Sequence, residues 1–246
     1  MPQIVDAIFG HKDHIGLEGF DMIPKNKMLV VSGLPRSGTS LCMQTLLGLG
    51  LDVAGDKWVK DNAKKNNERG QWEVTGVVFD GVRDLDEYGG KAIKLVSGGL
   101  IRTRKDLIWK GILCLRDPRE VLESNNKVNT EAELSSVTYI TYMTQILEVL
   151  REQDPRDWLI VDYKEPFESR TGYVEKIAKF VNVGLVPLHV VTNIKKRLYH
   201  CKSKEFDPRD AMGESAMFLY EVMHNPWNIS DKELNDILFW LKDEAA

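Results

Sequence analysis

Cysteine and long apolar runs are both scarce in this sequence. The 246 residues include three cysteines, Cys42, Cys114 and Cys201, which are odd in number and far apart. This pattern disfavours a disulfide framework or a zinc cluster and favours buried free thiols. No window has the eighteen or so consecutive apolar residues that span a bilayer, and residues 1–16 lack the charged-then-apolar order of a signal peptide. We therefore expect a soluble, cytoplasmic protein without a transmembrane segment.

An excess of positive charge is also absent. The formal net charge is −4 at pH 7, which argues against generic nucleic-acid binding but allows a local basic pocket for a small polyanion. With 43% hydrophobic residues, a chain of this length fits one large domain. We expect a single domain over residues 1–246, with its core at about 28–183 and a C-terminal helical part at about 210–246. The sequence does not define the oligomeric state.

Apolar runs that predict strands alternate with periodic segments that predict helices. The predicted strands are 28–31, 91–96, 110–115 and 158–163, and the predicted helices are a segment ending at residue 50, 130–151, 172–181 and two near the C-terminus. The serine and glycines at 97–99 predict the end of the second strand. This alternation predicts an α/β fold of three layers, in which helices flank a mainly parallel central sheet and the ligand lies outside the carboxyl ends of the strands.

The stretch at 28–50, MLVVSGLPRSGTSLCMQTLLGLG, joins the first strand to a helix through a glycine-rich turn. Such a turn aims backbone N–H groups and the positive end of the helix dipole at one point, which is a common way to hold a phosphate. The turn nearly matches the P-loop pattern G-x-x-x-x-G-K-[ST], but Thr39 stands where the lysine should be. The cation is instead Arg36, two residues before Gly38. We therefore expect a P-loop NTPase-like fold with an anion site at this turn.

A second cation follows the third predicted strand. That strand ends at Arg116, and Pro118 suits the first turn of a helix after it. Because the carboxyl ends of parallel strands lie on one rim of the sheet, we expect Arg36 and Arg116 on the same rim. Two separate cationic sites suit a ligand with two separated anionic groups.

Three segments together resemble the sulfotransferases that use 3'-phosphoadenosine 5'-phosphosulfate (PAPS) as donor. Residues 34–40, LPRSGTS, are similar to the family's loop for the donor's 5'-phosphosulfate. Residues 114–124, CLRDPREVLES, are similar to its 3'-phosphate motif, in which a strand-end arginine and a serine eight residues later bind the phosphate. Residues 160–166, IVDYKEP, followed by KIAKFV at 176–181, are similar to its strand ending in Tyr-Glu-Asp and the next helix. The resemblance spans about 28–183.

The resemblance implies transfer of a sulfuryl group from PAPS to an acceptor hydroxyl, with release of adenosine 3',5'-bisphosphate (PAP) and without a metal ion. The donor-binding residues that it implies are Pro35, Arg36, Ser37, Gly38, Thr39, Ser40, Arg116, Ser124 and Tyr163. Sulfuryl transfer moves an electron-poor group in line between two oxygens, so positioning and charge stabilisation should matter more than covalent catalysis. We expect Arg36 to neutralise charge on the leaving oxygen and Tyr163 to contact the adenine.

The acceptor hydroxyl needs a general base, and here the sequence departs from part of the family. Many cytosolic members carry Lys-Thr-His on the strand that corresponds to 91–96, where this chain reads KLV at 94–96. Other members use a glutamate, and many bacterial relatives carry N-x-x-G-[YF]-[WF]-E at a position like NERGQWE, 67–73. Glu73 is therefore the candidate base, with a solvated loop carboxylate as the alternative. Lys94 is expected either to assist at the sulfuryl group or to pair with an acid.

The C-terminal R-K-G-x-x-G-D-W signature of cytosolic members is absent as well. Lys195, Lys196 and Arg197 are candidates to supply charge near the 3'-phosphate, although a basic run of this length is usually a solvated face. Two other functions stay open. One is a P-loop nucleotide or small-molecule kinase, which needs Mg²⁺ and ATP and which Thr39 disfavours. The other is a non-catalytic module that binds PAP. Beyond its hydroxyl, the acceptor has no readable identity.

Overall fold

The structure, a computed structural model, describes residues 23–55, 72–74, 76–127 and 134–194. It also describes residues 213–230 and the positions 232, 233, 235, 236 and 239. Within this part of the chain, no helix is both long and apolar enough to cross a membrane.

Four strands form one parallel sheet. They are β1 (Met28–Gly33), β2 (Ala92–Val96), β3 (Ile108–Leu115) and β4 (Trp158–Asp162). All four predicted strands are confirmed, and their ends lie within two residues of the predicted ones. The strands are easy to recognise because parallel strands covered on both faces are almost continuously apolar, as β1 is.

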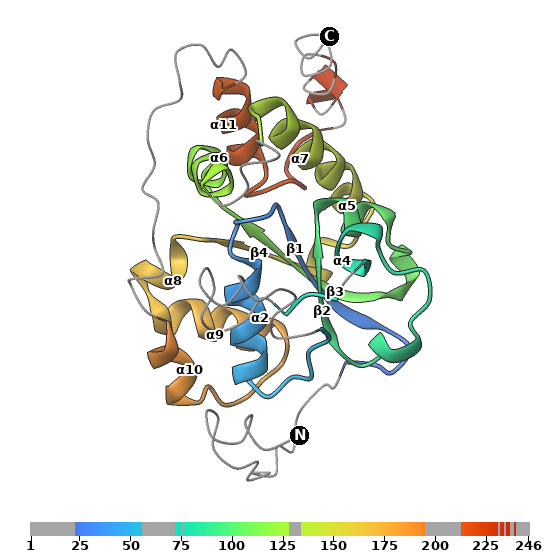
Figure 1. The fold of residues 1–246 in the computed structure, drawn as a ribbon, viewed down its shortest axis with the longest axis vertical. Helices are drawn as coiled ribbons and strands as arrows, with labels where there is room; N and C mark the ends of the chain where they lie inside the picture. Colours follow the sequence, from blue (N-terminus) through green and yellow to red (C-terminus); the bar gives the residue numbers. More distant parts are fainter. Residues whose placement is uncertain are drawn as a thin grey trace.

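The strand order is β2-β1-β3-β4, so β1 lies between two neighbours (Figure 1). Gly33, the last residue of β1, pairs with Val96 of β2 and with Cys114 of β3. Leu115 of β3 in turn pairs with Asp162 of β4. Since every pair is parallel, the carboxyl ends of all four strands lie at one edge of the sheet, where the sequence predicts a ligand site.

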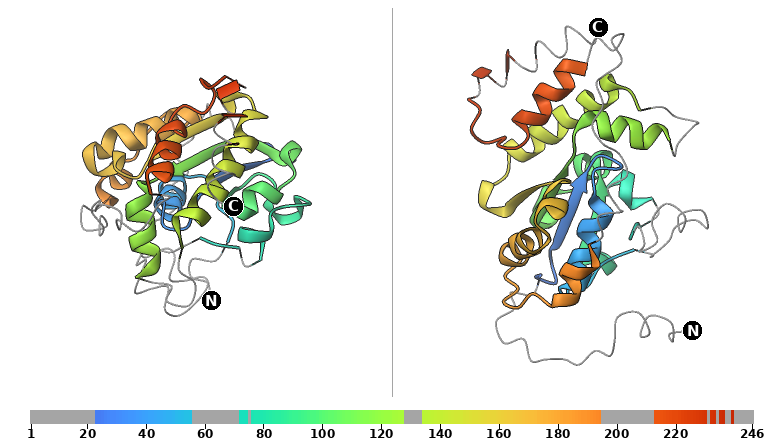
Figure 2. Two further views of the ribbon diagram at one scale, coloured as in Figure 1. Left: turned by 90° about the horizontal axis from the view of Figure 1, so that it is seen from above. Right: turned by 90° about the vertical axis from the view of Figure 1, so that its left-hand side faces the viewer.

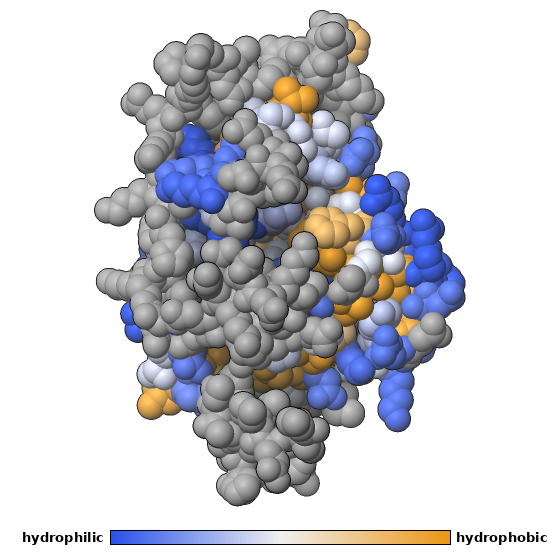
Figure 3. Space-filling view, in the orientation of Figure 1, coloured by the Kyte–Doolittle hydropathy of each residue, from blue (hydrophilic) through white to orange (hydrophobic). Residues whose placement is uncertain are grey.

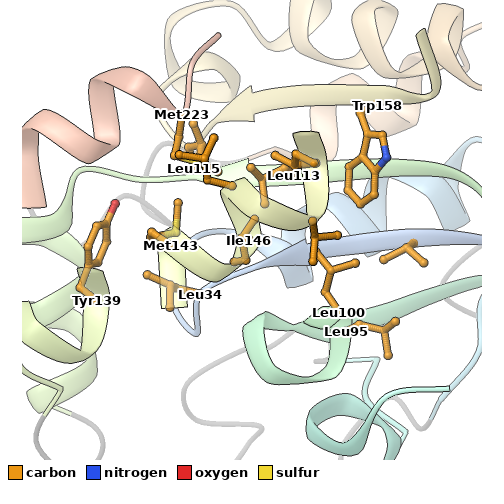
Figure 4. Packing of buried hydrophobic residues seen from close by; sticks show 14 of the residues in the cluster. Leu34, Leu95, Leu100, Leu113, Leu115, Tyr139, Met143, Ile146, Trp158 and Met223 are labelled. Carbon is orange, nitrogen blue, oxygen red and sulfur yellow. The ribbon is translucent and has the colours of Figure 1, made fainter. Parts of the chain in front are cut away.

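Side chains that alternate along each strand enter two separate hydrophobic cores. Leu29 and Val31 of β1 enter the first core, on one face of the sheet. Met28 and Val30 enter the second core, on the other face. Helices cover both cores, which completes the predicted three-layer α/β fold (Figures 1 and 2). Figure 4 shows the second core, in which Leu95 of β2 and Leu113 and Leu115 of β3 pack with side chains from the covering helices.

The first core is covered by α2 (Thr39–Gly48), α9 (Arg170–Phe180) and α10 (Leu188–Asn193). The second is covered by α5 (Ser97–Arg102), α6 (Pro118–Asn126), α7 (Ser136–Arg151) and α11 (Gly213–Val222). Shorter pieces are α4 (Val77–Asp80), α8 (Glu165–Glu168) and the 3-10 turns η1 (Asp86–Tyr88), η2 (Lys105–Leu107) and η3 (Pro155–Asp157). The predicted helices are confirmed where the structure describes them, with one exception. The helix predicted over 130–151 begins only at Ser136, because Ser135 is its extended N-cap; residues 128–133 lie outside the described residues.

Four helices, α4, α5, α8 and α10, were not predicted, and α5 shows why. The serine and glycines that end β2 also begin α5, at Ser97. A Cβ added at Gly99 would lie 2.3 Å from the Val78 carbonyl oxygen of α4, so glycine is needed for close contact between the two helices. The glycines therefore reflect this packing and not a loop.

Gly111 of β3 gives a test of this packing. A Cβ at this position would lie 2.4 Å from Cζ3 of the Trp158 indole, which is itself buried. We expect Gly111→Ala to lower the free energy of unfolding by about 1–3 kcal/mol, because the ring has to move within a packed core. Gly184→Ala is the matched control, since its Cβ would meet no atom within 4 Å. Equal urea midpoints for the two variants would contradict the packing described for β3 and β4.

Candidate active site

The turn after β1 has the backbone that an anion-binding loop requires. Positive φ angles occur at Gly33 (147°), Arg36 (72°) and Gly38 (102°). Gly38 is the N-cap of α2 and, as a glycine, has no side chain that can cap the helix. The first N–H groups of a helix have no partner within the helix, so this end of α2 is suited to bind an anion.

Polar atoms without a partner among the described residues mark the same loop. They are Oγ of Ser32, Oγ of Ser37 and Nη2 of Arg116, and all three side chains are buried. Leaving such a group unpaired costs about 1–3 kcal/mol, which a bound anionic ligand would offset. A small, partly open hollow lies beside the loop, lined in part by Ser37, Gly38 and Tyr163.

Arg116 is held firmly at the end of β3. Its Nε donates to Oε2 of the fully buried Glu120 at 2.9 Å, and its Nη1 donates to the Arg36 carbonyl oxygen at 3.0 Å. The guanidinium also lies over the Tyr163 ring, with Cζ 4.2 Å from the ring centroid. These contacts fix the guanidinium, and Nη2 stays buried without a hydrogen-bond partner among the described residues.

Arg36 and Ser124, which are far apart in the sequence, contact each other directly. The Arg36 Nε donates to the Ser124 Oγ at 3.0 Å, which joins the loop to α6. Asp117 caps this helix by accepting the Arg119 N–H at 3.0 Å, and the predicted role of Pro118 in its first turn is confirmed. The structure thus brings the predicted phosphosulfate loop and the predicted 3'-phosphate motif together.

Lys94 and Glu73 form an ion pair beside the first turn of α2. The Lys94 Nζ lies 2.5 Å from the Glu73 Oε1 and donates to the Ser40 Oγ at 3.1 Å. Burial lowers the pKa of Lys94, while the adjacent Glu73 carboxylate works against this change and the positive charge of Arg36 adds to it. Of the two functions expected for Lys94, pairing with an acid is the one that the contacts display.

Glu73 is placed by its backbone. A Cβ added at Gly55 would lie 2.7 Å from the Glu73 carbonyl carbon, so the two chain segments lie against each other. The Glu73 side chain is 24% exposed, whereas that of Lys94 is 5% exposed. Phe79 of α4 is exposed, and apolar surface is visible on the side of the molecule where α4 lies (Figure 3). The Glu73 carboxylate therefore pairs with a buried ammonium group and is itself partly exposed.

Three other predicted residues, Thr39, Tyr163 and Pro35, also lie at or beside the loop. Thr39 is the buried first residue of α2, and the Tyr163 ring lies against Gly38, where an added Cβ would be 2.6 Å from the ring. Pro35 belongs to the turn. The basic run Lys195, Lys196 and Arg197 lies outside the described residues.

The sequence reasoning missed Glu120, the buried carboxylate that pairs with Arg116. A local signal for it exists, because an acidic residue four positions after an arginine lies on the same face of a helix. It also gave no function to Asp162, which contacts Tyr220 of α11 and His224 in the turn after it, both distant in the sequence.

Comparisons with known proteins give structural likeness only. No family model and no curated protein matches this chain. Three of the solved structures that this chain resembles are a sulfotransferase domain, a sulfotransferase and a retinol dehydratase. The sulfotransferase domain of the Synechococcus PCC 7002 olefin synthase has 14% identity and a TM-score of 0.45, over 92% of this chain and 97% of that one. The mouse sulfotransferase SULT7A1 complexed with PAP has 12% identity and a TM-score of 0.43, over 90% and 84%. Retinol dehydratase in complex with androsterone and the inactive cofactor PAP has 13% identity and a TM-score of 0.42, over 91% and 82%. At these values the likeness carries no argument about activity.

Proposed function

We propose that this protein is a sulfotransferase that moves a sulfuryl group from PAPS to an acceptor hydroxyl. The observation that carries the proposal is the placement of two rigid cationic sites, Arg36 and Arg116, on one sheet edge, next to the Glu73–Lys94 pair. A ligand with two separated anionic groups and a reacting centre near one of them fits this arrangement. PAPS has that form.

Donor binding would use the contacts left open in the structure. The N–H groups at the start of α2, with the hydroxyls of Ser37 and Thr39, suit the phosphosulfate. Nη2 of Arg116 suits the 3'-phosphate, because guanidinium groups bind phosphate through directional, charge-assisted hydrogen bonds. Ser124, already in contact with Arg36, lies where it can join the two anionic sites.

The transfer itself would be an in-line displacement at sulfur. The acceptor oxygen forms a bond to sulfur while the bond from sulfur to the bridging oxygen breaks, and that electron pair stays on the departing PAP. Arg36 would stabilise the negative charge on the leaving oxygen. The hydroxyl proton would pass to the Glu73 carboxylate, which Lys94 holds beside the loop. In this mechanism the cationic side chains and backbone donors stabilise the charge, and no metal ion is required.

Ligand binding separates this proposal from a P-loop kinase. We expect PAP in EDTA to raise the melting temperature, because a ligand at 100 times its Kd stabilises the folded state by about 2.7 kcal/mol. ATP with Mg²⁺ should have no comparable effect. The measurement is a thermal-shift titration of the full chain with both ligands. Stabilisation by ATP with Mg²⁺ alone would establish the kinase alternative, and a lack of response to PAP would overturn the proposal.

The 3'-phosphate contact can be tested without leaving a buried charge unpaired. The paired substitution Arg116→Gln with Glu120→Gln removes both charges and keeps two side chains able to hydrogen-bond each other. We expect affinity for PAP to fall about ten- to a hundredfold, since hydrogen bonds to charged groups contribute about 1.5–3 kcal/mol. Adenosine 5'-monophosphate, which lacks the 3'-phosphate, should bind this variant and the original protein alike. A parallel loss for both nucleotides in calorimetry would exclude this assignment of Arg116.

Turnover with labelled PAPS and an acceptor screen tests catalysis. We expect Arg36→Ala to lower kcat by roughly a hundredfold or more, by analogy with the loss of one donor from an oxyanion hole. Arg156→Ala is the matched control, because this arginine is exposed in η3 and pairs with Asp154 at the amino end of β4. Near-normal turnover of Arg36→Ala would remove Arg36 from the chemistry. PAP binding by the original protein without any sulfated product would indicate the non-catalytic module.

A further inference from the structure

The carboxylate of Asp162, the last residue of β4, receives hydrogen bonds from three directions. Its Oδ1 accepts the backbone N–H of Lys164 at 2.8 Å. Its Oδ2 accepts the hydroxyl of Tyr220 and lies 3.2 Å from Nε2 of His224. Tyr220 belongs to α11 and His224 lies in the turn after it, so this single carboxylate joins the C-terminal end of α11 to the end of the sheet. The transfer mechanism gives none of these side chains a function.

The surroundings of His224 require a charged ring when both of its contacts form. Nδ1 lies 2.9 Å from the Tyr220 carbonyl oxygen, and Nε2 faces the Asp162 carboxylate. Both partners can only accept hydrogen bonds, so both ring nitrogens must carry protons. The hydrogen bond to Asp162 raises the pKa of His224, while partial burial works against it. The position just after the C-terminus of α11 also favours a cation.

Other charged and titratable groups face this cluster from neighbouring elements. They are Tyr139 of α7, Asp117 and Arg119 at the start of α6, Lys164 after β4, and Glu221 of α11. Burial and the Asp162 hydrogen bond raise the pKa of Tyr220, so its hydroxyl stays a donor. Burial raises the pKa of Asp162, but the hydrogen bonds from His224 and Tyr220 outweigh it and hold that pKa below its ordinary value. The pKa of Tyr220 is thus raised and that of Asp162 lowered, so neither group titrates near pH 7. His224, with an ordinary pKa of 6.5, is the member of the cluster that does.

Asp162 also shapes the turn that carries Tyr163. The bond from the Lys164 N–H closes a turn around Tyr163, whose own N–H donates to the Leu115 carbonyl oxygen at 2.8 Å. The Tyr163 ring then lies against Gly38 of the loop and over the Arg116 guanidinium. A change in the partners of Asp162 therefore acts one residue away from the two anion sites.

We propose that Asp162 is a positioning residue for the donor site, acting through Tyr163, and that the protonated His224, in the turn after α11, strengthens donor binding by holding Asp162. This inference rests on the proposed function, because it concerns affinity for PAP.

The direction of the pH effect follows from the raised pKa. A group whose pKa is higher in the folded protein contributes fully below its unfolded value, about 6.5, and its contribution is lost as the pH rises through the folded value. Affinity for PAP should therefore decrease as the pH rises from about 6.5 through the raised pKa of His224. We expect a decrease of about two- to fivefold, which corresponds to the usual contribution of a partly exposed ion pair. Ionisation of the PAP phosphates has the opposite effect, so a matched variant is needed.

The experiment is calorimetric titration of the full chain with PAP from pH 5.5 to 9. His224→Gln is compared with His189→Gln, which removes an exposed histidine on α10. We expect the original protein and His189→Gln to lose affinity with rising pH relative to His224→Gln. Asp162→Asn should abolish this difference and weaken PAP at every pH, and Tyr220→Phe should weaken PAP while keeping the pH dependence. Identical profiles for the original protein and His224→Gln would overturn the inference.

Thermal unfolding without ligand supplies an independent measurement. The original protein should exceed His224→Gln in stability below pH 6.5, and this difference should vanish at alkaline pH. An equal difference at all pH values would reduce His224 to a packing residue and overturn the inference. Absence of PAP binding by the original protein at every pH would overturn the proposed function, whereas PAP binding with no effect of His224 overturns only the inference.

Discussion

The candidate site depends on the parallel pairing of β1 with both of its neighbours. Because Gly33 pairs with Val96 and with Cys114, the loop after β1 lies between the ends of two strands. The same register pairs Val31 with Lys94, and the alternation along β2 turns Lys94 toward the face that α2 covers. A slip of one residue would turn Lys94 to the opposite face, away from Ser40. The sheet register therefore decides which cations reach the loop.

A second constraint is that two cations at this edge, Lys94 and Arg116, are buried and need anionic partners. Lys94 has Glu73 and Arg116 has Glu120. Buried pairs of this kind contribute little net stability, since desolvation of both ions offsets their attraction. They do fix the cations in place. In the case of Arg116, Nη2 stays buried and without a partner among the described residues, and this is the donor that the proposed 3'-phosphate contact would use.

Much of this arrangement was predictable because the signals are local. Apolar runs revealed the four strands, and the glycines around Arg36 revealed a turn that needs positive φ angles. The contacts that complete the site were not predictable. Lys94 meets Ser40 across 54 positions, and α11 brings Tyr220 to Asp162 across 58. Such contacts arise from helix packing on the sheet and leave no local pattern. α5 was missed because a glycine pair has the same sequence signal in a loop as in a close helix contact.

The geometry also gives a different meaning to the lysine that the loop lacks. In a P-loop of the usual kind the lysine belongs to the loop and reaches the terminal phosphates. Here Thr39 occupies that position and is buried, while an ammonium group reaches the first turn of α2 from β2, where it contacts the Ser40 hydroxyl. Because Glu73 pairs with this ammonium, Arg36 is the loop cation left to act on the donor in the proposed reaction. The same pair holds the carboxylate of Glu73, the proposed base, close to the first turn of α2, where Lys94 contacts Ser40.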